Sequence, residues 1–522
     1  MIARIPLRMR RAMPYLLVLA IVLGYLPSLS GGYLNWDDPW LIRDNPVLHD
    51  ASADALRKIW IDFSVETRMA LGAEYLPLRD TELWVEARVF GLSPAGLRAS
   101  ALALYVAACL CLRRALHLAT QRFAFAEVAA WVFALHPVHV ESVAWLSGRK
   151  DVLSLLFVCA ALAAYAGRSR ALHWCVPLLL LLAHLSKSMT VSALGLLFVI
   201  DLLARRRPNV RVLAACTLAA AVAVGLHTAV GDQVGMTQPH TGGGRLGQAL
   251  TMGPVVLRYV ALLAWPPALS LVQDVPAVVR PTTWAVVGLL VPAAWGAFGL
   301  WCWRARGRPL ALASFLAFFV PLTPVSQVLF PLQNQMADRY LFLSVLAVAL
   351  TVGHLFDEWR APSFAVAPLT VVAFGIATVE RASVLASSEL AFADAATKTA
   401  LSPTAPYQLA AALEERGDED GALAQYEQAL ARSRDRSEVG RRATNNIAKL
   451  RAKRNDLKGA VDVLEHGRAR WPDDPKMLLN LVRALSKLGR NSEARVAYDE
   501  LVRRFPNESR RADRAADTPL PR

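Results

Sequence analysis

The sequence predicts an all-α protein in which a polytopic membrane bundle is followed by a solenoid of helical repeats. Apolar residues make up 55% of the 522 residues and charged residues only 19%, against roughly 25% charged in an average soluble protein. Apolar blocks of about the 20 residues that a membrane-spanning helix needs recur from Pro14 to about Arg381. Beyond Arg381 the chain becomes polar and repeats itself. This organisation excludes a secreted enzyme, an array of cytosolic domains and a simple DNA-binding protein.

We expect about eleven spans. The first, Pro14–Leu29, follows a basic N-terminus and ends near Ser28-Leu29-Ser30, a triplet that also fits a cleavable signal peptide. The many later spans favour a retained helix. Those spans are predicted at residues 97–116, 123–137, 151–167, 171–186, 190–204, 210–230, 283–303, 309–323, 340–356 and 363–381.

The apolar segment 255–272 is ambiguous because Pro266 and Pro267 interrupt it. Counting it as a span would put the basic residues Arg304, Arg306 and Arg308 outside the cytoplasm, against the usual charge bias. We therefore interpret it as a re-entrant or interfacial helix.

The net charge of +15, from 57 Lys and Arg against 42 Asp and Glu, raises the possibility of a nucleic-acid partner. The basic residues, however, lie in short connections between apolar blocks, where they fix orientation in the membrane. We therefore expect no nucleic acid. This orientation places five loops and the tail outside the cytoplasm, namely 31–96, 138–150, 187–189, 231–282, 324–339 and the residues after Arg381. Abundant Ala and Arg suggest a bacterium, and hence an inner membrane with a periplasmic outer face.

The tail contains an internal repeat. Ala422, Ala460 and Ala494 align at offsets of 38 and 34 residues, and so do Gly417, Asn455 and Gly489. Thirty-four residues is the tetratricopeptide period. We predict about three helix–turn–helix units with a concave, peptide-sized surface, the alternative being an unrelated helical bundle. The expected domains are a transmembrane domain at 1–383, whose first outer loop is 31–96, a repeat solenoid at 384–510 and a disordered tail at 511–522.

Two adjacent carboxylates, Asp37 and Asp38, open the first outer loop directly after the first span. Such a pair at the membrane surface fits a general base or a cation site. The alternative is an ordinary cap or turn, because Asp followed by Pro commonly starts one. The loop continues for about 65 residues with further polar groups, among them Arg79, which is too long for a simple connection.

The second outer loop carries His136, His139 and Glu141, followed by Arg149 and Lys150. No regular spacing places the first three side chains on one face, so we predict no metal site. Arg149 and Lys150 sit where the chain re-enters the membrane, on the side where cations are unusual. A guanidinium and an ammonium there can hold a lipid phosphate, although both side chains can also simply reach for the interface.

Two further outer cations lie at membrane edges. Lys187 occupies a tiny outer turn, and Arg339 follows Asp338 at the start of a span. Taken with Arg149 and Lys150, they predict one binding site for an anionic group in the outer leaflet.

These segments resemble the transmembrane and tetratricopeptide-repeat O-mannosyltransferases and their bacterial relatives, which are integral-membrane glycosyltransferases of the GT-C type. The resemblance rests on WDDPWLIRDNPVL (36–48), YLPLRDTELWVEARVFGLSPAG (75–96), HPVHVESVAWLSGRKDVLS (136–154), HLSKSMTVSAL (184–194) and PLQNQMADRYLFLSV (331–345). These pieces follow the family's order and precede the repeat tail. Met189 and Arg98 depart from it, standing where proline and histidine are common, and they leave the acidic pair intact.

The resemblance implies an inverting transfer of a mannose-like sugar from a polyprenyl-phosphate donor to a hydroxyl, with a protein Ser or Thr as the expected acceptor. It implies Asp37 as the base, Asp38 as its positioning residue, and Arg149, Lys150, Arg339 and Lys187 as donor-phosphate ligands. His136, His139, Glu141, Arg79 and Asp338 are expected to support the site. No cofactor is required, although a divalent metal is not excluded.

The expected partners are the lipid-linked sugar in the membrane and a polypeptide held by the repeats. The alternatives are a transferase that modifies a glycan or lipid, and a non-catalytic transporter or scaffold with a docking module. A transporter is expected to carry polar residues at mid-membrane depth, whereas here they crowd one side.

Overall fold

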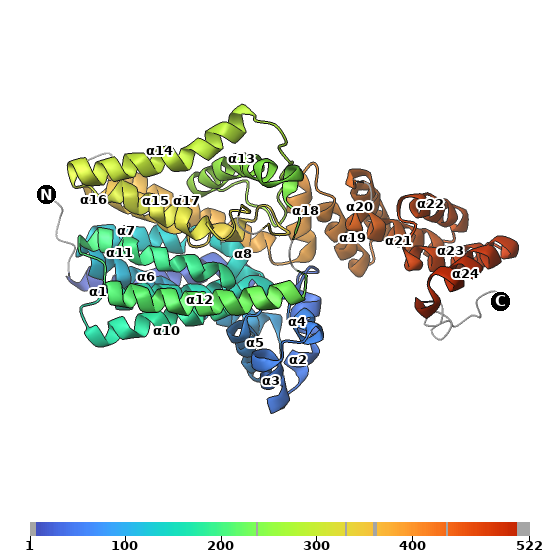
Figure 1. The fold of residues 1–522 in the computed structure, drawn as a ribbon, viewed down its shortest axis with the longest axis horizontal. Helices are drawn as coiled ribbons and strands as arrows, with labels where there is room; N and C mark the ends of the chain where they lie inside the picture. The colour runs from blue at the N-terminus through green and yellow to red at the C-terminus, as the bar shows by residue number, and fades with distance from the viewer. Residues whose placement is uncertain (1–6, 236–237, 329–330, 359–362, 435–436, 509–522) are drawn as a thin grey trace. The chain divides into compact units, whose positions relative to one another are not determined.

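The computed structural model describes residues 7–508 except 236–237, 329–330, 359–362 and 435–436, and this part of the chain contains helices and no strand (Figure 1). The predicted fold class, an all-α membrane bundle followed by a tetratricopeptide solenoid, is confirmed. The chain divides into two compact units. Unit 1 comprises Met1–Leu271 and Val275–Ser387, and unit 2 comprises Val272–Asp274 and Ser388–Arg522. The expected disordered tail at 511–522 lies outside the described residues.

Unit 1 is a bundle of apolar helices joined by short outer helices. Every predicted span coincides with one of its helices. The long elements are α1 (Leu7–Tyr25), α6 (Pro94–Thr120), α7 (Phe123–Ala134), α9 (Lys150–Ala166), α10 (Arg170–Ser186), α11 (Leu194–Ala204), α12 (Val210–Gln233), α13 (Arg245–Ala264), α14 (Thr283–Arg306), α15 (Leu310–Leu322), α16 (Val345–Glu358) and α17 (Ser363–Val384).

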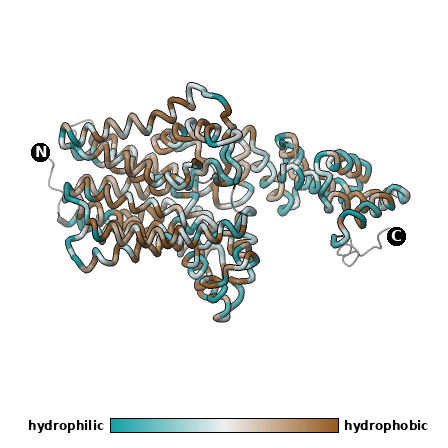
Figure 2. The backbone as a smooth tube through the Cα atoms, in the orientation of Figure 1, coloured by the Kyte–Doolittle hydropathy of each residue, from teal (hydrophilic) through white to brown (hydrophobic). Residues whose placement is uncertain are grey.

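Six described helices are long and apolar enough to cross a membrane: Arg8–Ser28, Pro94–Thr120, Val210–Gln233, Arg245–Ala264, Thr283–Arg306 and Val366–Val384. Figure 2 shows apolar residues along the bundle helices and a more polar mixture in the repeat helices. Large apolar side chains such as Leu218 on α12 and Leu290 and Phe298 on α14 are exposed. Exposed apolar surface of this kind is suited to lipid rather than water.

The ends of these helices follow from local sequence. Pro94 begins α6 and Pro77 begins α5 (Pro77–Phe90), where the missing N–H of proline costs no helical hydrogen bond. The side chains of Asn209 and Thr282 accept hydrogen bonds from Val212 N and Ala285 N and thereby cap α12 and α14.

The ambiguous apolar segment forms α13, which covers Arg245–Ala264 rather than 255–272 and ends before Pro266. The following extended segment returns beside the helix, because Val278 N donates to Thr251 Oγ1 at 2.9 Å. The first turns of α14 pack against Gly253, where a Cβ atom on Gly288 would lie 1.9 Å from the Gly253 carbonyl oxygen. Although α13 is long enough to span, this path brings the chain back to the first half of α13, which suits the re-entrant interpretation.

Short helices gather at one end of the bundle of unit 1 (Figure 1). The first outer loop folds into η2 (Pro39–Arg43), α2 (Pro46–His49), α3 (Ala53–Ile61), α4 (Val65–Ala70) and α5, and the second into α8 (His139–Ala144) and η3 (Leu146–Arg149). The turns η4 (Ser188–Ala193) and η6 (Asp338–Leu341) precede α11 and α16. These are the elements that position the candidate site.

The other ends of the helices carry a separate set of ion pairs. Glu127 on α7 binds Arg113 and His117 on α6, and Arg122 binds Asp357 at the end of α16. These residues belong to the connections predicted to be cytoplasmic. The predicted outer polar residues therefore gather at the end opposite to the basic connections.

Unit 2 contains α18 (Ser388–Lys398) and three helix pairs: α19 (Thr404–Arg416) with α20 (Glu419–Arg432), α21 (Glu438–Lys453) with α22 (Leu457–Arg470), and α23 (Pro475–Lys487) with α24 (Asn491–Arg504). Gly417, Asn455 and Gly489, which the repeat aligned, all have left-handed backbone with φ of 88°, 64° and 81°. Each residue therefore turns the chain between the two helices of its pair, which explains the recurrence of glycine or asparagine.

The core of unit 2 is built from the repeated small and apolar positions. Ala460, Leu464, Leu481, Ala494 and Leu501 are buried in one cluster that joins the second and third pairs. The offset of 38 residues between the first two aligned positions, against 34 between the next two, comes mainly from a longer helix. We expected the four additional residues in the polar connection Arg432–Glu438, but α21 has 16 residues against 13 in α23, and the connection 433–437 is only one residue longer than 471–474. Residues 435–436 lie outside the described part of the chain.

Candidate active site at the outer end of the bundle

The two adjacent acids of the first loop have different environments. Asp38 is fully buried and accepts hydrogen bonds from Leu34 N at 2.9 Å, Ser147 N at 2.9 Å and Ser147 Oγ at 2.6 Å. Burial raises the pKa of its carboxyl to about 6, although these hydrogen bonds oppose the shift. Asp38 thus joins the first outer loop to the second and has no accessible oxygen for a substrate.

Asp37 is partly exposed and directly precedes this anchor. Its carbonyl oxygen accepts a hydrogen bond from Leu41 N at 3.0 Å, which fixes the backbone at the start of η2. Among the described residues, no ion pair engages its carboxylate. Burial raises the pKa of Asp37, while the nearby positive charges of Lys150 and Arg339 lower it. Asp37 is therefore the carboxylate of the pair that can meet a substrate.

Three cations lie at the same end of the bundle, each beside a carboxylate. Lys150 forms an ion pair with Glu74, and its side chain is 21% exposed. Arg339 binds Glu141 through Nη1 at 2.5 Å and through its backbone N at 3.1 Å, and its side chain is 13% exposed.

The third cation, Lys187, pairs with the buried Asp151 and lies deeper, at 7% exposure. Burial lowers the pKa of Lys187, and the positive charges of Lys150 and Arg339 lower it further, while Asp151 opposes the shift. The three cations are therefore close enough to act on one another, and together with Asp37 they form one electrostatic group.

Glu74 completes this group. Burial opposes its ionisation, but Lys150, Arg79 and His227 outweigh burial and lower its pKa to about 2. Glu74 therefore stays charged at neutral pH and balances Lys150. A bound anion would have to share Lys150 with it.

Aromatic rings line the cations. The guanidinium of Arg339 lies over the ring of Trp145, 5.3 Å from its centroid, and Trp145 packs on Trp36 at 5.9 Å between ring centroids. The ammonium of Lys187 lies 4.9 Å from the centroid of Phe342. Cation–π contacts of this kind help to hold the charged groups in place.

Arg149 does not join this group. Its side chain is 1% exposed, and its Nη2 donates to Glu82 at 2.7 Å and to Glu86 at 2.6 Å, both on α5. The guanidinium thereby fixes α5 to the start of α9. We correct the expectation that Arg149 is a donor-phosphate ligand, because its hydrogen-bonding groups face buried carboxylates.

The residues expected to support the site bind the surrounding backbone. His136 Nε2 lies 3.0 Å from Leu263 O, and His139 Nε2 lies 2.8 Å from Phe342 O, so these buried rings join the start of α8 and the residues before it to neighbouring segments. Asp338 accepts from Ser270 N at 2.5 Å.

Arg79 lies within the first loop. It binds Leu71 O at 2.6 Å and Asp80 at 2.7 Å, and it lies near Glu74. Of the five expected supporting residues, Glu141 is in direct contact with a cation of the group, and Arg79 reaches the group through Glu74.

Sequence reasoning did not assign Glu74, Asp151 or His227 to the site. Glu74 directly precedes one quoted motif and Asp151 lies within another, but nothing in the sequence pairs them with Lys150 and Lys187. His227 could have been recognised from the sequence as a candidate, because it is a titratable residue near the outer end of an apolar span. Within the described residues, no group of three or more His, Cys, Asp or Glu side chains is arranged to hold a metal ion.

This arrangement offers an accessible carboxylate beside partly exposed cations at a membrane edge. A carboxylate of raised pKa can accept a proton from a hydroxyl. The cations Lys150 and Arg339 can bind a phosphate and stabilise the charge that grows on it when a bond to it breaks.

Three comparisons relate the chain to known proteins. A tetratricopeptide-repeat family model matches residues 451–516. The Protein O-mannosyl-transferase F38B6.6 of Caenorhabditis elegans is 29% identical over 198 residues, which is 36% of this chain and 28% of the relative, so the match spans less than a third of that protein. The oligosaccharyltransferase of Archaeoglobus fulgidus, solved with a tethered acceptor peptide, is similar over 78% of this chain and 59% of its own, with 14% identity and a TM-score of 0.36.

Proposed function

We propose that this chain, which resembles the tetratricopeptide-repeat O-mannosyltransferases, is an inverting membrane glycosyltransferase. It transfers a mannose-like sugar from a polyprenyl-phosphate donor to a hydroxyl acceptor, for which we propose Ser or Thr of a polypeptide. The observation that carries the proposal is the accessible carboxylate of Asp37, whose pKa the cations Lys150 and Arg339 influence directly.

In the proposed reaction, Asp37 takes the proton of the acceptor hydroxyl as its oxygen attacks the anomeric carbon. The new bond between carbon and oxygen forms while the bond from that carbon to the phosphate oxygen breaks, through an oxocarbenium-like transition state. The polyprenyl phosphate leaves with the bonding electron pair. Lys150 and Arg339 stabilise its negative charge. Lys187, which is more deeply buried, adds a third positive charge.

Asp38 acts in this proposal as a positioning residue. Its hydrogen bonds to Leu34 N and to Ser147 hold the first and second outer loops together. Asp37 stands next to Asp38 in the first loop and Lys150 stands three residues after Ser147 at the end of the second, so this junction helps to set the distance between the base and the phosphate ligand.

We place the site on the periplasmic face of a bacterial inner membrane. The support is that the basic connections, such as those containing Arg113 and Arg122, lie at the end of the bundle opposite to the site. Short basic connections favour the cytoplasm. The repeat solenoid would then present the acceptor polypeptide on the same face.

A transfer assay tests the proposal. Purified full-length protein in lipid nanodiscs is given polyprenyl-phosphate mannose or glucose with a radiolabelled sugar, and a Ser/Thr peptide, a lipid or a glycan as acceptor. We expect label on the peptide from one donor and loss of transfer in Asp37→Asn. Label on lipid or glycan alone would favour the alternative transferase, and full activity of Asp37→Asn would contradict the proposal.

A further inference from the structure

A second pocket of unit 1 lies at the end of the bundle opposite to the candidate active site, where α6 turns into α7. It has a volume of about 390 Å³ and is lined by Arg113, Arg114, His117, Leu118, Gln121 and Phe123. This volume falls in the range of about 300–1,000 Å³ that is usual for sites of small ligands. We call it the basic pocket, and the proposed transfer reaction does not use it.

A single carboxylate balances only part of the positive charge of the basic pocket. Glu127, which is buried on α7, accepts hydrogen bonds from Nε of Arg113 at 3.1 Å and from its Nη2. The same carboxylate lies 2.8 Å from Nε2 of His117. Arg113 is thereby held in place, yet its side chain stays 17% exposed and its Nη1 forms no hydrogen bond within the described residues. A fixed guanidinium with unused donors can bind a second anion.

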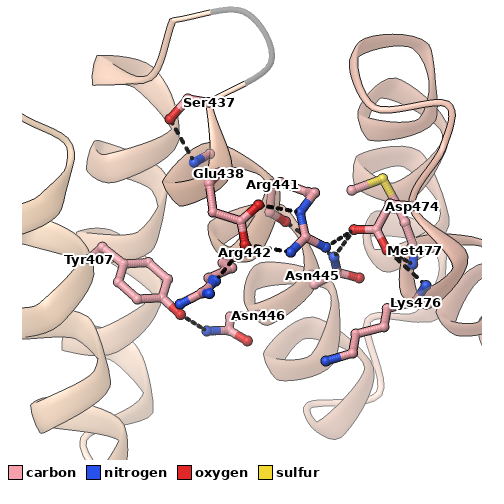
Figure 3. A network of polar contacts seen from close by, with 11 residues as sticks. Tyr407, Ser437, Glu438, Arg441, Arg442, Asn445, Asn446, Asp474, Lys476 and Met477 are labelled. Atoms are coloured by element: carbon pink, nitrogen blue, oxygen red, sulfur yellow. Dashed lines mark hydrogen bonds and ion pairs between the residues drawn. The ribbon is translucent and has the colours of Figure 1, made fainter. Parts of the chain in front are cut away.

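Arg114 adds a positive charge that the protein leaves unmatched. It is exposed, and its side chain forms neither an ion pair nor a hydrogen bond in the part of the chain that the structure describes. Arginines on the first helix of the second repeat pair differ in this respect (Figure 3). There Arg441 pairs with Glu438 and Asp474, and Arg442 pairs with Glu438. An anion from outside the chain can therefore complete the pairing of Arg114.

The start of α1 brings another guanidinium to the edge of the basic pocket. Cζ of Arg10 lies 4.8 Å from the centroid of the Phe123 ring. That ring in turn lies 5.2 Å from the ring of His117, measured between centroids. Positive groups from two helices thus border the pocket.

The length of α6 places the basic pocket at the depth of lipid headgroups. The helix has 27 residues and begins at Pro94, at the end of the bundle that carries the candidate active site. Arg113 stands 19 residues after Pro94, which is about 30 Å along the helix axis. The hydrocarbon core of a bilayer is also about 30 Å thick. Arg113 and Arg114 therefore lie where the hydrocarbon of the opposite leaflet gives way to phosphate groups.

An uncovered face of α6 leads to the basic pocket. Its residues recur every three or four positions and are exposed or half-buried among the described residues: Ala99, Ala103, Val106, Leu110, Arg114 and His117. This spacing places them on one side of the helix. Acyl chains that lie against the apolar part of this face bring their headgroup to Arg114.

We propose that the basic pocket binds the phosphate group of an anionic phospholipid in the leaflet opposite to the candidate active site. Arg113 and Arg114 bind the phosphate oxygens, and the acyl chains lie along Val106 and Leu110. Gln121 Nε2 donates to Leu118 O at 2.9 Å, which leaves Oε1 of Gln121 to accept a bond from a headgroup hydroxyl. A soluble phosphate ester offers the same charge, but it has no acyl chain to cover the apolar face of α6.

The test counts bound lipids directly and needs no sugar donor. Full-length protein in an uncharged detergent is titrated with palmitoyl-oleoyl phosphatidylglycerol or with the zwitterionic phosphatidylcholine of the same chains, and native mass spectrometry gives Kd for the first bound lipid. We expect phosphatidylglycerol to bind at least about tenfold more tightly than phosphatidylcholine.

Three variants separate the basic pocket from general electrostatics and from the cations of the candidate active site. Arg114→Glu should weaken binding of phosphatidylglycerol at least about fivefold. Leu118→Trp keeps the charge but fills the pocket, and it should weaken binding to a similar extent. Arg211→Glu is the matched control, because Arg211 is also exposed and lacks an ion pair among the described residues, but lies in another basic connection. It should change Kd less than twofold, and thermal unfolding checks that all three variants fold.

Equal affinities for the two lipids would overturn the inference, and so would equal losses in Arg114→Glu and Arg211→Glu. Full binding by Leu118→Trp would also contradict it, because the lipid would then not enter the pocket. Glycerol phosphate, titrated in the same way, is the soluble probe. If it bound as tightly as phosphatidylglycerol and Arg114→Glu abolished its binding, the pocket would serve a soluble phosphate ester and the lipid assignment would fall.

Discussion

The carboxylate of Asp38 accepts hydrogen bonds from both the backbone N and the Oγ of Ser147, at 2.9 and 2.6 Å, across 109 residues of sequence. This junction holds the first outer loop against the second. It also leaves the neighbouring Asp37 as the accessible acid. The two neighbouring acids therefore have different roles: Asp38 stabilises the fold, and Asp37 can meet a substrate.

Substitution of each acid should reveal this division. Asp37→Asn is expected to lower the rate of sugar transfer by about 10²- to 10⁴-fold, the usual range for a lost general base, with little change in thermal stability. Asp38→Asn should instead lower stability by about 1–3 kcal/mol, because its amide cannot accept all three hydrogen bonds.

Ser147→Ala provides the matched control for Asp38, since it removes one partner of the same junction. The stability losses of the two substitutions should not add when they are combined, because both disturb the same hydrogen bond, from Ser147 Oγ to the side chain of residue 38. Thermal unfolding of the four proteins measures this. A stable Asp38→Asn protein that has lost all transfer activity would instead make Asp38 the base.

Arg149 and Lys150 are adjacent but should behave differently on substitution. Arg149→Met leaves Glu82 and Glu86 buried without their partner, so we expect a loss of about 3–5 kcal/mol in stability. Lys150→Met should lower stability less, because Arg79 also lies near Glu74, and should raise the KM for the polyprenyl-phosphate donor about tenfold. Donor-dependent kinetics and thermal unfolding of both proteins test the contrast, and a donor KM that responds only to Arg149 would reverse the assignment.

The rate of transfer should rise with pH as Asp37 loses its proton. Burial raises the pKa of Asp37, so the acidic limb of the profile should lie above the ordinary aspartate value of about 3.9. Lys150 and Arg339 lower this pKa and Glu74 raises it. Arg339→Gln is therefore expected to move the limb to higher pH, and Glu74→Gln to lower pH. Profiles of kcat against pH for the three proteins decide this, and shifts of the same sign in both variants would be inconsistent with it.

Asp38 should make stability depend on pH in the acidic range. Its pKa of about 6 in the folded chain exceeds the value of about 3.9 in an unfolded chain. The folded state therefore binds the proton more tightly, and the resulting stabilisation is complete below about pH 4 and disappears as pH rises through about 6.

The measurement is the melting temperature of the wild type relative to Asp38→Asn at several pH values. The advantage of the wild type should decrease between about pH 4 and 6, by on the order of 2 kcal/mol in unfolding free energy. An advantage that grows with pH over this range would show that the Asp38 carboxyl is ionised more easily than an ordinary one.

The fold was predictable because it depends on local patterns. Apolar length predicted the helices of unit 1, and the alignment of Gly417, Asn455 and Gly489 predicted the turns of unit 2, since each needs left-handed backbone. The extent of α13 was not predictable from apolarity alone. In its first turn the polar Gln248 is buried, and its amide donates a hydrogen bond to Gln335, a contact across 87 residues.

The candidate site was predictable in part. The motifs drew attention to Asp37, Lys150, Lys187 and Arg339, because charged residues at a membrane edge are unusual. They did not distinguish Arg149 from Lys150. That difference depends on Glu82 and Glu86 meeting the end of η3, and hence on how α5 packs, which adjacent sequence does not encode.

A single-turnover experiment tests the central claim most directly, namely that Asp37 transfers the proton while Lys150 and Arg339 hold the donor. Saturating polyprenyl-phosphate mannose is bound first, acceptor peptide is added, and both donor Kd and the rate of the chemical step are measured. For Asp37→Asn we predict an unchanged Kd and a chemical step at least about 100-fold slower, and for Arg339→Gln a Kd raised about tenfold. A normal chemical step in Asp37→Asn, or a donor Kd that Arg339→Gln leaves unchanged, would contradict the account.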